Sequence, residues 1–173
     1  MSPKPHLEDL ALEAPKGPIR LDSARAIQQT SALMATRARR ELLIFGRTLD
    51  PEIYDRGEFL DGVRRLALNR ASICVRILLF DTREATRAGH RLIEMSRHLT
   101  SRIAIQCVSE DDRDRLDAFL VIDERGYVRR RLADTMEATA DFDNPHESRL
   151  LRTDFEQMWD RSSPDAEMRR LYL

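Results

Sequence analysis

Arginine is the residue type in this chain that is best suited to binding chemistry. Lysine occurs only at Lys4 and Lys16, so guanidinium groups carry almost all of the positive charge. A guanidinium binds phosphate or carboxylate groups in a bidentate manner. A simpler explanation of the enrichment is a GC-rich genome, because the arginines are spread over the whole chain.

Three consecutive arginines, 129–131, end a strand-like run. Side chains alternate along a strand, so Arg130 should point with Val128 to one face, and Arg129 and Arg131 to the other. If the Arg130 face is covered, its guanidinium needs a partner, which predicts an ion pair or a bound anion. The alternative is an edge strand whose charges face water. Arg130 is therefore a candidate ligand-binding residue.

Two histidines, His90 and His146, are candidate ligand-binding residues that could also act as general bases beside nearby carboxylates. His90 follows Gly89 in a helical stretch, where a surface or hydrogen-bonded histidine is the simpler interpretation. His146 lies in the run DFDNPHE, residues 141–147, which gathers several oxygen and nitrogen donors. Capping of a helix by Asn144 explains that run more simply than a metal loop does. We predict no metal site and no cofactor.

The composition is that of one globular, highly charged domain. The chain has 173 residues, 42% hydrophobic and 34% charged, with a net charge of −1. This charge argues against nucleic-acid binding by a global basic field, although a local patch remains an alternative. No apolar run is long enough for a membrane span, and the two cysteines fall in apolar runs outside any CxxC. These features predict a cytoplasmic protein with buried free thiols.

Strands and helices should alternate along most of the chain. Residues 1–19 hold four of the seven prolines and are expected to form a flexible tail or linker, leaving 20–173 as a single domain. We expect strands at 42–45, 73–80 and 103–108, and helices at 23–40, 51–67, 82–99 and 145–161. This alternation favours βαβ units and a sheet that begins parallel. The fold class expected is a mixed β-sheet flanked by helices, an α/β/α sandwich.

The stretch Leu116–Leu132, LDAFLVIDERGYVRRRL, predicts a strand, a tight turn and a second strand. Glu124, Arg125 and Gly126 would form the turn, with the glycine supplying a positive φ. The sheet would then end in this antiparallel pair, and residues 133–144 would be polar and irregular.

This order of elements resembles one half of the phospholipase D-like superfamily, over about residues 22–163. The segment HRLIEMSRHLTSRIAIQCV, from His90, reads like that family's helix leading to the strand before its motif. It is also similar to an uncharacterised set of proteobacterial domains in that superfamily. The family places its site between two halves, so the resemblance implies a homodimer or a partner domain.

The superfamily motif is His-x-Lys, four residues, then Asp, and its histidine forms a covalent phosphohistidine while the lysine holds phosphate oxygens. By this resemblance the Asp is Asp123, whereas Leu116 and Ala118 occupy the His and Lys positions. Neither histidine nor lysine occurs anywhere between Cys107 and Met136, so a small shift of the alignment restores nothing. The resemblance therefore implies a catalytically degenerate domain, with Asp123 kept as a candidate site residue.

Three functions are compatible with these features. The first is a degenerate phospholipase D-like binding or protein-interaction module for a phosphate-bearing ligand. The second is an enzyme that uses other residues, such as His90 or His146 with nearby carboxylates. The third is a nucleic-acid-associated protein that uses a local patch at residues 129–131.

Overall fold

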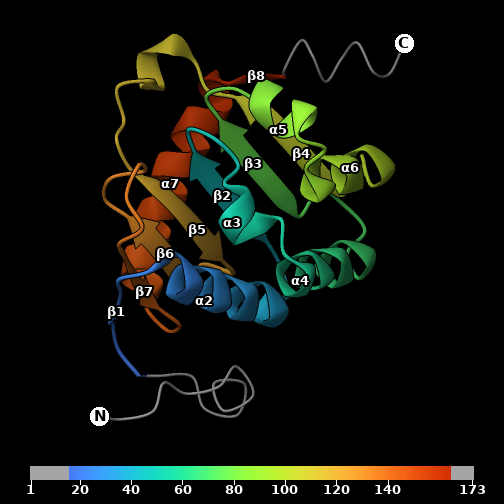
Figure 1. Cartoon of the computed structure of the whole chain (residues 1–173). Coiled ribbons are helices and arrows are strands. Elements are labelled where there is room, and N and C mark those ends of the chain that lie inside the picture. Colours follow the sequence, from blue (N-terminus) through green and yellow to red (C-terminus); the bar gives the residue numbers. More distant parts are fainter. Residues whose placement is uncertain (1–15, 165–173) are drawn as a thin grey trace.

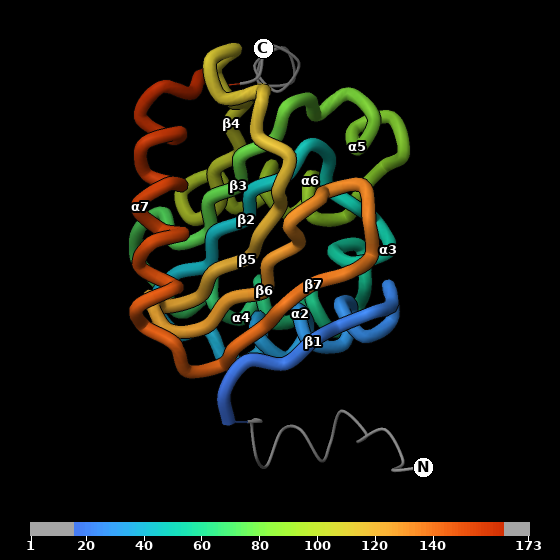
Figure 2. The backbone as a smooth tube through the Cα atoms, turned by 90° about the vertical axis from the view of Figure 1, so that its left-hand side faces the viewer, coloured from blue at the N-terminus to red at the C-terminus, as the bar shows by residue number. Residues whose placement is uncertain are grey.

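The computed structural model describes residues 16–164, which form three layers around one mixed sheet. Helix α7 lies on one face of the sheet and the other helices cover the opposite face (Figures 1 and 2). The expected α/β sandwich is confirmed. Residues 1–15 and 165–173 lie outside the described part, as do most of the expected N-terminal tail and the expected C-terminal helical tail.

The sheet has eight strands in the order β1-β7-β6-β5-β2-β3-β4-β8. The strands are β1 (Ile19–Leu21), β2 (Leu42–Gly46), β3 (Val75–Leu79), β4 (Ile103–Cys107), β5 (Ala118–Ile122), β6 (Gly126–Arg130), β7 (Ala138–Asp141) and β8 (Ser163–Pro164). The helices are α2 (Ala24–Arg37), α3 (Pro51–Tyr54), α4 (Gly57–Leu68), α5 (Arg83–Arg87), α6 (Arg91–His98) and α7 (Pro145–Arg161), with a short 3₁₀ helix η1 (Glu110–Asp112).

Strand β2 lies at the centre of the sheet because both of its faces are apolar. All five of its residues are buried. It pairs in parallel with β3 and antiparallel with β5, and β3 in turn pairs in parallel with β4. The carboxyl ends of β2, β3 and β4 therefore meet at the end of the sheet where β5 begins and β6 ends.

Two hydrophobic clusters hold the layers together. The larger lies between the sheet and helices α2, α3, α4 and α6, and the smaller lies under α7. Helix α2 packs closely on α4 at Gly62, where an added Cβ would lie 2.8 Å from the Ala35 backbone carbon. Two helix starts are capped by side-chain oxygens, that of Ser23 at α2 and that of Asn144 at α7.

The sheet extends further than the sequence suggests. Residues 133–144 are not irregular throughout, because β7 forms there and pairs with β6, and β1 pairs with β7. Strand β6 is thus an inner strand, and the edge-strand interpretation of Arg130 is wrong. Short strands rich in alanine and threonine, such as β7, carry too little apolar alternation to be predicted.

Two predicted helices are each divided in the structure. Residues 51–67 form α3 and α4, and residues 82–99 form α5 and α6. The second break falls at Gly89, whose φ of 68° is a conformation that glycine adopts without strain. None of the helices within residues 16–164 combines the length and apolar character required to cross a lipid bilayer.

Candidate functional site

Leu116 and Ala118, which the resemblance expects at the superfamily's His and Lys positions, lie where β5 begins. Leu116 precedes the strand and is 55% exposed, whereas Ala118 is buried at 2%. A Cβ added to the neighbouring Gly46 would lie 3.7 Å from the Ala118 Cβ, which is an ordinary van der Waals contact. Ala118 is also the cross-strand partner of Arg130. Ala118 therefore presents only a methyl group beside Arg130.

Arg130 is buried, 3% exposed, and both of its terminal guanidinium nitrogens have protein partners. One nitrogen, Nη2, lies 2.5 Å from Asp50 Oδ2, and Nη1 donates to the Ala133 carbonyl at 2.8 Å. A further long contact reaches the Thr135 carbonyl at 3.5 Å. A covered Arg130 was expected to have either an ion pair or a bound anion, and the structure contains the ion pair with Asp50.

Asp50 and Tyr54 complete this buried cluster from the chain that follows β2. Asp50-Pro51 is a typical sequence for a helix start, but the Asp50 side chain makes no capping bond to α3 and pairs with Arg130 instead. Burial raises the pKa of Tyr54 to about 12, with the Arg130 charge opposing and the Asp50 charge assisting that rise. The tyrosine is therefore a neutral phenol at physiological pH, and the cluster holds one cation against one anion.

A second polar network lies on the other face of the same strands. Asp117 accepts bonds from Arg115 at 2.8 and 3.0 Å, and Arg129 Nη2 lies 3.5 Å from the same carboxylate. Arg115 also contacts Asp154 of α7 at 3.2 Å. Burial raises the pKa of Asp117, but the two arginines outweigh that effect and hold the pKa below its usual range. The network fastens β5 to α7.

Asp123 lies at the opposite end of β5, far along the strand from Arg130. Its carboxylate accepts three backbone N–H bonds, from Arg39 at 2.9 Å, Arg40 at 2.8 Å and Glu41 at 2.9 Å. Asp123 and Glu124 have positive φ values of 53° and 54°, so they form the hairpin turn. The predicted role of Gly126 in supplying positive φ is wrong.

The two candidate histidines lie at opposite ends of the sheet, and His90 lies beside Leu49 and Asp55, next to the segment that carries Asp50. His90 is 2% exposed and caps α6, with its Nδ1 accepting from the Leu92 N–H at 3.2 Å. Burial lowers the pKa of His90, while Asp55 raises it and Arg91 lowers it further. His146 is exposed in the first turn of α7, at the end of the sheet near Asp123. The four candidate site residues therefore do not form one site.

The predicted capping of α7 is present. The Asn144 side-chain oxygen accepts from the Glu147 N–H at 3.1 Å, and Asp141 accepts from the Asp143 N–H at 3.1 Å. Within residues 16–164, no group of three or more His, Cys, Asp or Glu side chains is arranged to hold a metal ion. Both cysteines in this part are free thiols, with Cys74 buried and Cys107 half-buried.

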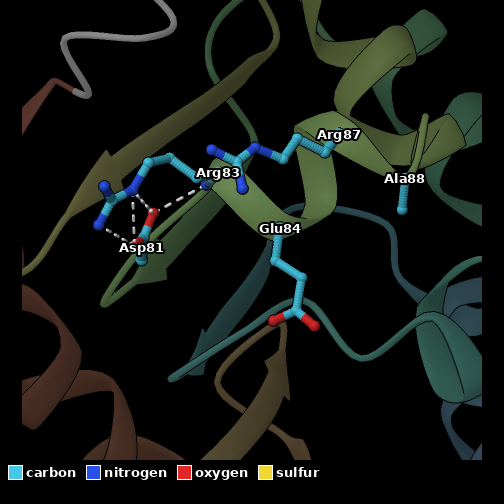
Figure 3. A pocket seen from close by; sticks show the side chains of 5 residues that line it. All are labelled: Asp81, Arg83, Glu84, Arg87 and Ala88. Atoms are coloured by element: carbon cyan, nitrogen blue, oxygen red, sulfur yellow. Dashed lines mark hydrogen bonds and ion pairs between the residues drawn. The ribbon is translucent and has the colours of Figure 1, made fainter.

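Two of the surface hollows have balanced charges. The first, beyond β3, is lined by Asp81, Arg83, Glu84, Arg87 and Ala88. Figure 3 shows Arg83 folded back onto Asp81, which it contacts at 2.8 Å, while Glu84 points away from both arginines. The second, beside Asp123, is lined by Arg40, Glu41, Arg70, Ile73, Asp123, Glu124 and Arg152. In both hollows the acidic side chains match the arginines in number.

A third hollow, of about 490 Å³, has an excess of arginine. It lies where β6, β7 and β1 run side by side, at the edge of the sheet that faces the viewer in Figure 2. Three arginines and one glutamate contribute its charges, and the lining is Arg20, Arg129, Arg131, Leu132, Thr135, Glu137, Ala138 and Thr139. We call these residues the arginine hollow.

Sequence reasoning missed Asp50, Tyr54 and Arg20 as members of these groups. Asp50 carries the signature of a helix cap, and that signature concealed its long-range partner 80 residues away. Arg20 was placed at the first position of the domain with no strand predicted there, because the three residues of β1 give no detectable period. No local signal in the sequence marks either contact.

Comparisons with known proteins agree with this architecture. A family described as "Domain of unknown function (DUF7931)" matches residues 22–171. No curated protein sequence matches the chain. Two similar solved structures have about the length of this chain. Nuc from Salmonella typhimurium, a phospholipase D family member, has a TM-score of 0.55 at 14% identity, covering 86% of this chain and 99% of Nuc. NucT from Helicobacter pylori has a TM-score of 0.57 at 8% identity, covering 86% and 98%.

A third similar structure is that of TrmBL2, an archaeal chromatin protein described as having a novel mode of DNA binding. Its TM-score is 0.60 at 14% identity, and the match covers 92% of this chain but only 59% of TrmBL2. At these identities the likenesses show the fold, which is phospholipase D-like.

Proposed function

The chain belongs to the DUF7931 family of domains of unknown function, and we propose that it is a phospholipase D-like domain that binds rather than cleaves its ligand. One observation carries the proposal. Ala118, in the position expected for the catalytic lysine, is buried against Gly46, and the adjacent Arg130 is already neutralised by Asp50. A methyl group holds no phosphate oxygen, and a guanidinium with a carboxylate partner has little charge left for a phosphate.

The alternative of an enzyme with other catalytic residues receives no support from the histidines. The His90 Nδ1 serves as a helix cap in a buried position, and His146 is exposed at the other end of the sheet from Arg130. A general base must reach the proton that it abstracts, within about 3 Å or through one water. His90 has the Asp55 carboxylate near it, but its Nδ1 is occupied by the Leu92 N–H.

The experiment is a phosphodiesterase assay on the purified protein. We expect no turnover of bis(p-nitrophenyl) phosphate above a buffer blank, across pH 5 to 9 (roughly the range over which histidine and its neighbours change charge). The matched variants are Asp50→Asn and His146→Ala. Turnover that disappears in either variant would show that the domain is an enzyme and overturn the proposal.

We also propose that the end of the sheet at Leu116 pairs with a second copy of the chain. The Ala133 N–H donates to the Leu116 carbonyl at 2.7 Å, which holds Leu132 beside Leu116. These leucines are 55% and 47% exposed, and adjacent exposed leucines are typical of contact surfaces. Light scattering should give a dimer mass for the wild type and a monomer mass for the Leu116→Ser, Leu132→Ser double variant. A monomeric wild type contradicts this pairing.

A further inference from the structure

We propose that the arginine hollow is the binding site for a phosphate group of the ligand. This inference rests on the proposed function, since it assigns a ligand chemistry and a place to a domain that binds without cleaving. The hollow lies on the α7 side of the sheet, whereas the Asp50–Arg130 pair is buried on the other side. Binding in the hollow is therefore independent of the lost catalytic positions.

The strand register brings the three arginines together. Arg20 pairs across strands with Thr139, and Thr139 pairs with Arg129, so these residues form one row on one face of the sheet. Arg20 and Arg129 are two strand spacings apart, about 10 Å, and Arg131 is about 7 Å along the chain from Arg129. An arginine side chain is long enough for all three guanidinium groups to contact one phosphate or two neighbouring ones.

The charges of the hollow are not balanced by the protein. Within residues 16–164, neither Arg20 nor Arg131 has a carboxylate partner in an ion pair. Arg129 contacts Asp117 only at 3.5 Å, and its buried Nε has no hydrogen-bond partner within the described residues. In the hollow beside Asp123, by contrast, Arg152 lies 2.5 Å from Glu41. The arginine hollow therefore lacks an anion that the other hollow supplies from its own chain.

The lining favours a phosphate over a simple carboxylate. One guanidinium is enough to bind a carboxylate in a bidentate manner, whereas three spread over this area suit an anion with several oxygens and more charge. The exposed Thr139 hydroxyl between Arg20 and Arg129 adds a neutral donor. Leu132, 47% exposed, forms an apolar rim of the hollow. The hollow therefore suits a phosphate group.

The phosphate group could belong to a mononucleotide or to a nucleic-acid strand, and binding titrations distinguish these two sources. The probes are inorganic phosphate, adenosine 5′-monophosphate and a short fluorescent single-stranded oligodeoxynucleotide, followed by calorimetry and fluorescence anisotropy. A mononucleotide site should bind the monophosphate as well as the oligonucleotide. A site for a nucleic-acid strand should prefer the oligonucleotide, with affinity falling as salt rises at a logarithmic slope of about −0.7 for each phosphate contacted.

The variants are chosen to change the net charge of the arginine hollow in opposite directions. Arg20→Gln and Arg131→Gln should each weaken binding about tenfold, since each removes one charge-assisted contact. Glu137→Gln removes the single carboxylate of the lining and should strengthen binding about threefold, by relieving its repulsion of the phosphate. A loss of folding cannot produce that gain. The matched control is Arg64→Gln, an exposed arginine on α4 that lies 4.0 Å from Asp61.

The outcomes separate this inference from the proposed function. Opposite effects of Arg131→Gln and Glu137→Gln, with Arg64→Gln unchanged, support the site. No binding of any probe at about 50 mM salt, or equal affinity in all variants, overturns it. A wild type that binds nothing and also fails to cleave bis(p-nitrophenyl) phosphate removes the hollow as a site but leaves the non-catalytic assignment standing.

Discussion

Arginines on the two faces of β6 have different surroundings. Arg130 points into the larger core cluster, is 3% exposed and contacts a carboxylate and two carbonyls. Arg129 and Arg131 point to the other face, where the arginine hollow contains one glutamate. The pleat of the strand places Arg130 beside Asp50 and puts Arg131 on the other face, where it has no ion-pair partner within residues 16–164. Residue type and spacing indicate that an arginine needs an anionic partner. The surroundings of its side chain determine whether that partner is a carboxylate of the protein or a bound ligand.

The largest effect on stability should come from breaking the buried ion pair between Asp50 and Arg130. We expect Asp50→Ala to lower the free energy of unfolding by about 3–5 kcal/mol, because it leaves the Arg130 charge buried without its carboxylate. Urea unfolding followed by circular dichroism measures the change. The Tyr54 hydroxyl cannot replace the carboxylate, because burial keeps it neutral.

The double variant Asp50→Ala, Arg130→Met is the control for this prediction. Removing both charges and filling the space with an apolar side chain should recover most of the lost stability, since the cost lies in the unpaired charge. A loss below about 1 kcal/mol in Asp50→Ala alone would mean that water reaches Arg130. The two faces of β6 would then differ far less than their burial indicates.

A smaller loss is expected at the other end of the hairpin. Asp123→Ala should cost about 2–3 kcal/mol, because three backbone N–H groups lose a charged acceptor and the positive φ disfavours alanine. Asp123→Asn should cost about half as much, since asparagine keeps one oxygen acceptor and tolerates this conformation. Both variants should bind phosphate probes as the wild type does. Lost binding with unchanged stability would instead make Asp123 a site residue.

Much of the fold was predictable because the central strands and capped helices carry strong local signals. Strands β2, β3 and β4 read as apolar runs, and Asn144-Pro145 marks the start of α7. Strands β1 and β7 were not predicted, since they are held by pairing with neighbours rather than by their own hydrophobic pattern. The edge of the sheet was therefore placed wrongly, and β6 was left as the last strand.

The site was less predictable for the same reason. The sequence indicated that Arg130 needs a partner but not that Asp50 supplies it, because a contact across 80 residues leaves no local pattern. The role of His90 as a cap depended on the break at Gly89, inside a stretch that reads as one helix. Arg20 joins the arginine hollow only through β1. Local patterns identify charged groups, whereas tertiary pairing decides which of them remain available.

A third prediction concerns the pH dependence of the free energy of unfolding, to which the buried helix cap His90 contributes. Burial lowers the pKa of His90 below its ordinary value of 6.5, so the unfolded chain binds more protons as pH falls below that value. The stabilisation is complete above pH 6.5 and is lost as pH falls toward the folded pKa, by at most about 1.4 kcal/mol per pH unit. His90→Asn keeps a capping oxygen for the Leu92 N–H but cannot titrate. Its unfolding free energy should therefore fall less than that of the wild type between pH 7.5 and 5.5, and equal slopes would contradict a buried neutral imidazole.

The smallest effect should come from the exposed side of the comparison. Arg131→Gln and Arg20→Gln should each change the free energy of unfolding by no more than about 0.5 kcal/mol, because neither guanidinium has an ion-pair partner within residues 16–164. Arg130→Gln, one position away from Arg131, should be destabilising by several kcal/mol, since it strands the Asp50 carboxylate. Urea unfolding of the three variants in parallel gives the difference directly. If Arg131→Gln proves as costly as Arg130→Gln, its charge is already satisfied within the fold, and the arginine hollow has no unbalanced charge to offer a phosphate.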